Sequence, residues 1–203
     1  MIKLIDNTGR EILSQDSLIP NLASADLSYA NLDGWDFRLN FTKTKCFATS
    51  FVGCTFRGVK FFGNTLYMSK FQNATFFDCQ FEDVLWSGSH LTSSTFQNCK
   101  FKNCFLEASY LDETHFSDVT LVNCSLKHSN VSRATLNGVN IYKSNLRSVD
   151  LRDSYIGDSI LHGNEMSESL LTNARLKNTY VLKCELFRAE LDWNLHDSII
   201  KND

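Results

Sequence analysis

The chain repeats an apolar residue at every fifth position, and this period restricts its fold more than any other feature. Counting from Phe41 in steps of five, every residue up to Leu191 is apolar. Two residues before each of them lies a second row whose members are nearly all small, such as Ser94 and Cys99. We call these the large row and the small row. An α-helix repeats every 3.6 residues and a flat strand every two, so neither explains a period of five.

A chain that turns a corner every five residues does have this period. Each straight side then places one large and one small side chain inside, and four sides close a coil of about 20 residues. Successive coils stack as parallel strands about 4.8 Å apart. The period therefore predicts an all-β solenoid with a filled interior.

Several short segments also match a known consensus, Ala-Asp/Asn-Leu followed by any two residues. The matching segments are Ala25-Asp26-Leu27, Ala30-Asn31-Leu32, Ser144-Asn145-Leu146, Val149-Asp150-Leu151 and Ala189-Glu190-Leu191. At these positions the chain resembles the pentapeptide-repeat family. The resemblance implies a right-handed quadrilateral parallel β-helix of about 8–9 coils, with short N- and C-terminal caps.

The period divides the chain into three parts. Residues 1–19 do not follow it and are expected to form an N-terminal cap, with a short hairpin around residues 6–9. Residues 20–193 form the β-helix, and residues 194–203 form a C-terminal cap or tail. This tail is expected to lie over the last coil or to pair with a second copy of the chain. Near Arg38 to Asn40 the phase slips by one residue, which indicates either a loop or a shortened corner.

The cysteines follow the period and are expected to be reduced core residues. Six of the seven lie in the small row and Cys46 lies in the large row. Their spacing fits neither a zinc site nor a disulfide framework, so we expect no metal and a reducing compartment. The chain has no apolar stretch of the ~20 residues that span a bilayer and no N-terminal signal pattern. A cytoplasmic protein without a membrane partner is expected.

Catalysis is not expected. A filled prism offers no concave site in which reacting groups converge. The histidines, of which His90, His115, His128 and His162 fall on outward positions of different coils, have no partners in the pattern of a triad or a metal site. We therefore expect no enzyme activity and no cofactor.

One side of the predicted coil carries outward apolar residues on successive coils. We call this group the apolar patch, and its members are Phe47, Tyr67, Met68, Leu85 and Phe105. A contiguous aromatic patch on a soluble protein is typical of a protein-binding surface. Either a partner or the N-terminal segment folded back could cover it. The patch favours a protein–protein interaction module, acting as a monomer or as a homodimer through a terminal element.

Charged residues are predicted to separate onto two opposite sides. The basic side carries six lysines against Glu82 and Asp83; the lysines are Lys43, Lys60, Lys100, Lys102, Lys143 and Lys183. The acidic side carries Asp112, Glu113, Asp150, Asp153, Glu190 and Asp192. Lys70, Arg133 and Arg152 share the acidic side.

The family resemblance gives the acidic side a second interpretation. Members of the family mimic DNA, bind bacterial type II topoisomerases such as gyrase, and protect them from quinolone-like inhibitors. A DNA mimic of this kind is therefore the alternative function, with a topoisomerase as partner and no direct nucleic-acid binding. The formal net charge of −3 and the lysines argue against it, since a mimic needs a strongly negative surface.

Overall fold

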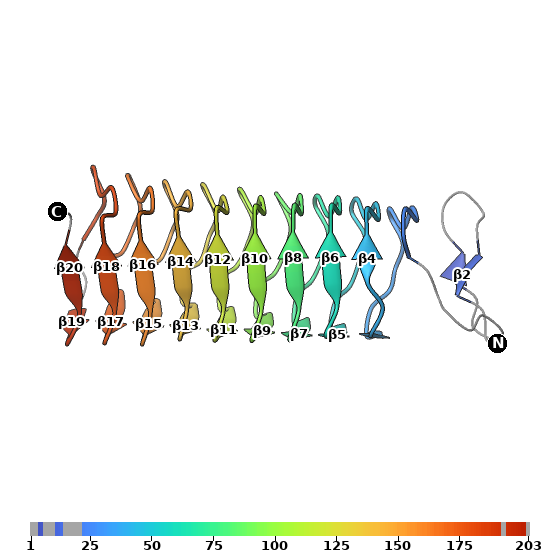
Figure 1. Cartoon of the computed structure of the whole chain (residues 1–203), viewed down its shortest axis with the longest axis horizontal. Helices are drawn as coiled ribbons and strands as arrows, with labels where there is room; N and C mark the ends of the chain where they lie inside the picture. The colour runs from blue at the N-terminus through green and yellow to red at the C-terminus, as the bar shows by residue number, and fades with distance from the viewer. Residues whose placement is uncertain (1–3, 6–10, 14–21, 192–193, 202–203) are drawn as a thin grey trace.

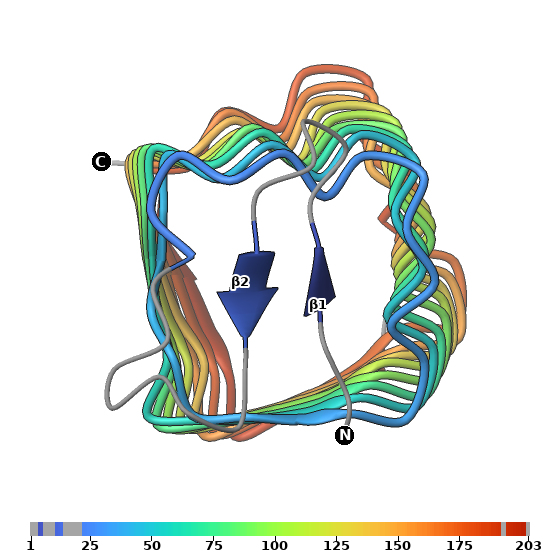
Figure 2. The ribbon, with the colours of Figure 1, turned by 90° about the vertical axis from the view of Figure 1, so that its right-hand side faces the viewer.

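The backbone winds into stacked coils that form a straight rod (Figure 1). The computed structural model describes residues 4–5, 11–13, 22–191 and 194–201. These residues form strands, bridges and turns without a helix, so the described chain contains no helix able to cross a membrane. Seen along the rod, each coil has four sides (Figure 2), as the five-residue period predicts.

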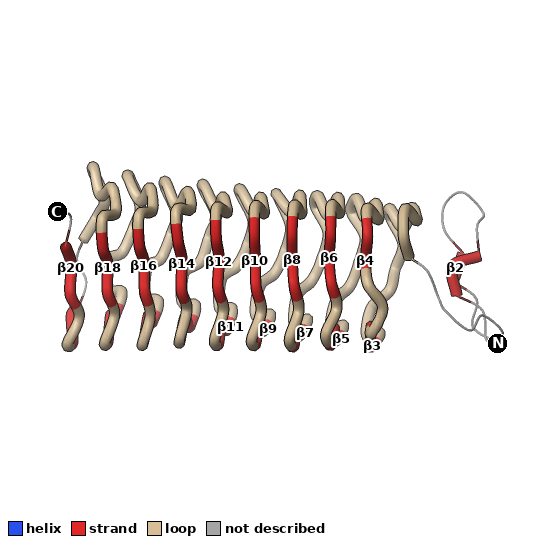
Figure 3. Tube along the Cα trace, in the orientation of Figure 1, coloured by secondary structure: helices blue, strands red, loops and turns tan. Residues whose placement is uncertain are grey.

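Two adjacent sides of the rod are continuous parallel sheets of nine strands each. Figure 3 shows their strands stacked coil upon coil. One sheet contains β3 (Asp36–Phe37), β5 (Thr55–Arg57), β7 (Thr75–Phe77), β9 (Thr95–Gln97), β11 (His115–Ser117), β13 (Thr135–Asn137), β15 (Tyr155–Gly157), β17 (Arg175–Lys177) and β19 (Asn194–His196). The other contains β4 (Phe41–Thr42), β6 (Lys60–Phe62), β8 (Gln80–Glu82), β10 (Lys100–Lys102), β12 (Thr120–Val122), β14 (Asn140–Tyr142), β16 (Ile160–His162), β18 (Tyr180–Leu182) and β20 (Ile199–Lys201).

The remaining two sides are held by single bridges and tight turns. Bridges such as Leu85 to Phe105 and His90 to Tyr110 repeat from coil to coil in parallel. On these sides an amide bonds to the carbonyl three residues earlier, as from Cys54 N to Phe51 O at 3.1 Å. All four sides therefore satisfy their backbone groups within or between coils.

The corners require a backbone conformation that most residues avoid. The second residue after almost every large-row residue has a φ of about +50° to +66°, in the left-handed region. Glycine takes this conformation without strain, as at Gly58, and Asn and Asp tolerate it better than other residues. Ala48, Met68 and Ala108 adopt it without that advantage.

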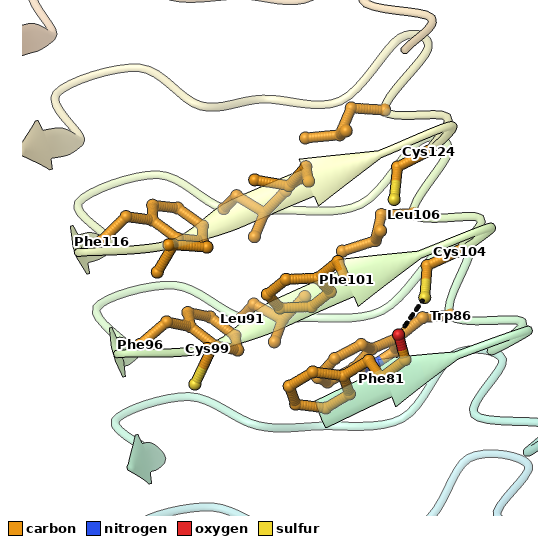
Figure 4. Packing of buried hydrophobic residues seen from close by; sticks show 14 of the residues in the cluster. Phe81, Trp86, Leu91, Phe96, Cys99, Phe101, Cys104, Leu106, Phe116 and Cys124 are labelled. Atoms are coloured by element: carbon orange, nitrogen blue, oxygen red, sulfur yellow. Dashed lines mark hydrogen bonds between the residues drawn. The ribbon is translucent and has the colours of Figure 1, made fainter. Parts of the chain in front are cut away.

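The large row fills the interior. Its members from Phe41 to Val181 are buried. Phenylalanines one coil apart stack nearly parallel, as in Phe76 on Phe96 with ring centroids 4.6 Å apart and in Phe81 on Phe101 at 4.4 Å. Figure 4 shows this packing around Trp86. The stacked phenylalanines of the large row therefore form an aromatic ladder from coil to coil.

The interior is less completely filled where aliphatic residues replace the rings. After Phe116 the large row consists of Leu, Ile, Val and Met. There the core encloses a narrow cavity of about 20 Å³, lined only by apolar side chains between Leu126 and Leu161. The backbone fixes the size of each coil, so smaller side chains leave space between them.

The small row keeps its polar members bonded to the backbone. Ser89 Oγ donates to Leu66 O at 2.7 Å and Ser109 Oγ to Trp86 O at 3.0 Å, each joining one coil to the previous one. Cys104 Sγ contacts Phe81 O at 3.4 Å in the same manner (Figure 4). Asn64 and Ser94 differ, because both polar atoms of the buried Asn64 amide and the hydroxyl oxygen of Ser94 are without a partner.

The phase slip near Arg38 to Asn40 is a shortened corner. β3 and β4 are joined there without a residue of positive φ, and Phe37 pairs with Phe56, 19 residues later instead of 20. Asn40 compensates for the missing residue, since its Oδ1 accepts the amide hydrogen of Lys60 at 2.9 Å.

At the C-terminal end the coil continues beyond the predicted boundary at residue 193. β19 and β20 pair in parallel with β17 and β18, so the expected tail extends both sheets by one strand. Leu186 is only partly buried and Leu191 is 40% exposed. The prediction that both are core residues is wrong. The coil that contains them is not covered by another full coil, so their side chains stay partly in contact with solvent.

At the N-terminal end, β1 (Leu4–Ile5) and β2 (Glu11–Leu13) pair in antiparallel fashion. This is the hairpin pairing predicted for residues 1–19. The other residues of that segment lie outside the described part of the chain, and the capping role stays a prediction.

Candidate protein-binding surface

The apolar patch forms on one of the two bridged sides, as the period predicts. Leu85 pairs with Phe105 one coil later, and the amide of Ala48 bonds to Tyr67 O at 2.9 Å. These contacts place all five predicted residues on one side of neighbouring coils. The rod holds them in place, because each of the five adjoins at least one buried residue of its own coil, and Leu85 and Phe105 each lie between two.

Much of this apolar surface faces solvent. Met68 is 58% exposed and Phe105 is 45% exposed, while Phe47, Tyr67 and Leu85 are half-buried against their neighbours. Most of the N-terminal segment lies outside the described residues, so the interpretation that it folds back over the patch stays a prediction. A partner would gain by covering these side chains, since each square ångström of apolar surface removed from water contributes about 25 cal/mol.

Sequence reasoning missed one member of this surface, Tyr29. Its ring meets that of Phe47 edge-on with centroids 5.4 Å apart, and its amide bonds to Phe47 O at 2.9 Å. Tyr29 is the most exposed aromatic residue that the structure describes, at 74%. The shortened corner lies between Tyr29 and Ala48, so these equivalent positions are 19 residues apart instead of 20. Counting back from Met68 in steps of 20 therefore misses Tyr29.

The basic side coincides with the outer face of the sheet from β4 to β20. All six predicted lysines are exposed there. Lys102 Nζ lies 2.7 Å from Glu82 Oε1, so one lysine is paired with an acid of the neighbouring coil. The lysine of β20, Lys201, extends the basic side toward the C-terminal end.

The acidic side forms as predicted, but arginines of the same side neutralise three of its five described carboxylates. Arg133 contacts Asp112 at 3.5 Å and Glu113 at 3.2 Å. Arg152 contacts Asp150 at 2.6 Å. Asp192 lies outside the described residues.

The pair between Asp150 and Arg152 also affects proton binding. Partial burial acts to raise the pKa of Asp150, but the hydrogen bonds from Arg152 outweigh it, and the pKa lies below its usual range. The carboxylate stays charged at neutral pH, yet its charge is balanced locally. The acidic side therefore presents a weaker negative field than its composition indicates.

The remaining nucleophilic and titratable groups do not converge. The described histidine side chains lie on separate coils, as His90, His115, His128 and His162. Within the described residues, no three His, Cys, Asp or Glu side chains are placed to share a metal ion. The seven cysteines are buried and form no disulfide, and burial raises the pKa of Cys54 to about 11. A buried thiol that stays protonated at neutral pH is inert.

Comparisons with known proteins support the fold. A family model described as a pentapeptide repeat region matches residues 94–171. A trypsin-treated form of QnrB1, a plasmid-mediated fluoroquinolone resistance protein, is 16% identical with a TM-score of 0.59, and the match covers 87% of this chain and 90% of that chain.

A second solved structure is HetL from the cyanobacterium Nostoc, a pentapeptide-repeat protein involved in the regulation of heterocyst differentiation. It is 19% identical with a TM-score of 0.39, and the match covers 89% of this chain and 84% of that chain. A search of curated proteins gave no match. The chain thus carries a pentapeptide-repeat region at residues 94–171, and its five-residue period and four-sided parallel coil agree with that match.

Proposed function

We propose that this protein is a non-catalytic protein–protein interaction module that binds its partner through the apolar patch. The observation that carries the proposal is the contiguous exposed surface formed by Tyr29, Phe47, Met68 and Phe105. Aromatic and methionine side chains are enriched at the centres of protein interfaces. The rigid filled coil supports this role, because the patch needs no ordering when a partner binds.

Charge substitution in the patch tests the proposal. We expect the double variant Tyr67→Glu/Phe105→Glu to lose the proteins that the immobilised wild type retains from an extract of its source. Tyr110→Glu is the matched control, since Tyr110 occupies the equivalent bridge position on the neighbouring side and is 48% exposed. Circular dichroism should show the same β-rich fold for all three proteins. Retention of the same proteins by the double variant would contradict the proposal.

The DNA-mimic function is the alternative, and the acidic side is what favours it. Asp153 accepts a hydrogen bond from Asn173 Nδ2 at 3.1 Å and Glu190 accepts one from Thr172 Oγ1 at 3.5 Å, so these partners are neutral, and the fold is shared with QnrB1. The pairing of Asp112, Glu113 and Asp150 with arginines weighs against it. A gyrase supercoiling assay with and without a quinolone separates the two functions. Inhibition or rescue at low micromolar protein would favour the mimic.

The proposal includes a cytoplasmic location and either a monomer or a homodimer. Seven buried cysteines without a disulfide support a reducing compartment. The exposed Leu191 at the C-terminal end supports self-association there. If a homodimer forms through this end, sedimentation should give twice the monomer mass for the wild type and the monomer mass for Leu191→Glu.

A further inference from the structure

Sulfur atoms are distributed unequally between the core and the outer surface. The seven cysteines are buried, and Met166 is a fully buried member of the large row. Met68 differs from them, because 58% of its surface is exposed. Among the residues that the structure describes, no other sulfur atom belongs to an exposed side chain.

Met68 lies at the centre of the apolar patch. Tyr29 and Phe47 lie on coils that precede the coil of Met68, and the amide of Tyr29 bonds to Phe47 O. Leu85 and Phe105 lie on coils that follow it, and they pair with each other. A partner that covers the whole patch therefore also covers Met68.

The surroundings of Met68 leave its side chain open to solvent. Met68 occupies a corner with a φ of 55°, and its amide bonds to Ser87 O of the next coil at 3.2 Å. The same corner of the two neighbouring coils carries Ala48 and Gly88. A Cβ on Gly88 would lie 3.7 Å from Met68 Cγ, so the Met68 side chain extends over a position where the next coil has no side chain. Alanine and glycine are too short to screen the thioether.

We propose that Met68 is a site of reversible oxidation that controls binding through the apolar patch, an inference that rests on the proposed function of the patch. The oxidant is hydrogen peroxide. The thioether sulfur attacks one peroxide oxygen, the O–O bond breaks and an S–O bond forms, so that the products are methionine sulfoxide and one water. The sulfur loses two electrons, and both protons of the peroxide leave in the water.

Oxidation makes the centre of the patch polar. Methionine is a flexible apolar residue suited to binding surfaces, whereas its sulfoxide is polar. The sulfoxide oxygen accepts hydrogen bonds from water, and an apolar partner surface that covers it offers no replacement. We expect binding through the patch to weaken about tenfold. The fold should not change, because the Met68 side chain lies outside the core.

Burial of the other sulfur atoms makes the modification selective. Peroxide reaches the buried cysteines and Met166 only when coils open, so Met68 reacts first. Methionine sulfoxide reductases reverse the step, with one enzyme for each sulfoxide epimer. A dithiol supplies two electrons and two protons, and the oxygen leaves as water.

Peroxide treatment of the native full-length protein tests the selectivity. Mass spectrometry of proteolytic peptides follows Met68 and Met166 separately. Met68 should gain an oxygen at least about tenfold faster than Met166 in the native protein. In guanidinium chloride the two rates should converge, because unfolding exposes both side chains. Equal rates in the native protein would overturn the proposal.

Chromatography on immobilised phenyl groups tests the change in polarity without a partner protein. The oxidised wild type should elute earlier than the untreated wild type, and both reductases together should restore the original elution. Met68→Leu keeps Met1 and Met166, yet peroxide should not change its elution. Met166→Leu is the matched control and should shift as the wild type does. An unshifted wild type, or an equal shift of Met68→Leu, would overturn the proposal.

Retention of proteins from an extract separates this inference from the proposed function. The proteins to follow are those that the wild type retains and that Tyr67→Glu/Phe105→Glu loses. Peroxide treatment of the immobilised wild type should lower their retention about tenfold, and the reductases should restore it. Undiminished retention after complete oxidation of Met68 would overturn the control by oxidation and leave the patch as the binding surface. Unchanged retention by the double variant would refute the patch, and this inference with it.

Discussion

At the scale of single residues, the corner conformation is the most demanding requirement of this fold. Nearly every pentad places one residue at a positive φ, and many of these are neither Gly, Asn nor Asp. A residue with a Cβ loses roughly 1–2 kcal/mol in this conformation. The chain tolerates the strain because the neighbouring large and small residues are buried and fix the corner from both sides.

Exchanging residues at corners should change stability in opposite directions. Ala108→Gly should stabilise the fold by about 0.5–1 kcal/mol, because the relief of strain exceeds the added entropy of the unfolded chain. Gly58→Ala should destabilise it by about 1 kcal/mol or more. No atom lies within 4 Å of a Cβ at Gly58, so this cost would reflect the backbone alone. Urea unfolding measures the change in the free energy of unfolding for each variant. Changes of the same sign would contradict the explanation from corner strain.

Buried thiols should make the protein less stable at alkaline pH. Burial raises the pKa of Cys54 to about 11 and also raises the pKa of Cys46. In the unfolded chain a thiol ionises near pH 8.5, so between these values the unfolded state binds fewer protons and gains stability. Each such thiol should lower the free energy of unfolding by about 1.4 kcal/mol per pH unit above pH 9. A Cys54→Ala variant should show a shallower decline, and an unchanged slope would be evidence against this cause.

At the scale of structural elements, stacked rings join successive coils. Phe76 lies between Phe56 and Phe96, with centroid distances of 4.7 Å and 4.6 Å and nearly parallel planes. In a solenoid each coil contacts mainly its two neighbours, so these contacts carry much of the coupling between coils. Beyond Phe116 the large row has no aromatic rings, and the coils there enclose a cavity.

Removing a ring from the middle of the ladder should therefore lower the free energy of unfolding by more than the change in side-chain volume alone indicates. Phe76→Leu should destabilise the fold by about 1–3 kcal/mol through lost stacking and a new cavity. The reverse change, Leu136→Phe, extends the ladder from Phe116 into the cavity that Leu136 lines. It should leave stability unchanged or raise it. Thermal unfolding measures both changes. Comparable destabilisation by the two variants would contradict the expectation that a ring at position 136 fills the cavity and extends the ladder.

The sequence predicts these elements well because the period of five acts on every coil alike. The sorting of Phe76 or Cys99 into the core follows from position alone. Features that depend on long side chains or on chain ends are not periodic. Arg133 reaches Asp112 and Glu113 through its rotamer, and Leu191 is exposed because no complete coil follows it. Tyr29 was missed because the shortened corner changes the register from 20 to 19 residues.

At the scale of the whole molecule, a filled rod restricts binding to its outer surface. The described interior holds a narrow apolar cavity, and the described titratable groups are spread over separate coils. The apolar patch is part of that outer surface, and the rigid coil holds its side chains in a fixed arrangement.

The central claim is that the five-residue period sorts every side chain into the core or onto the outer surface. The thiols test it most directly, because all seven cysteines are at most 3% exposed. Titration of the native protein with Ellman's reagent should give no rapidly reacting thiol, and titration in guanidinium chloride should give all seven. Rapid reaction of several thiols in the native protein would contradict the claim.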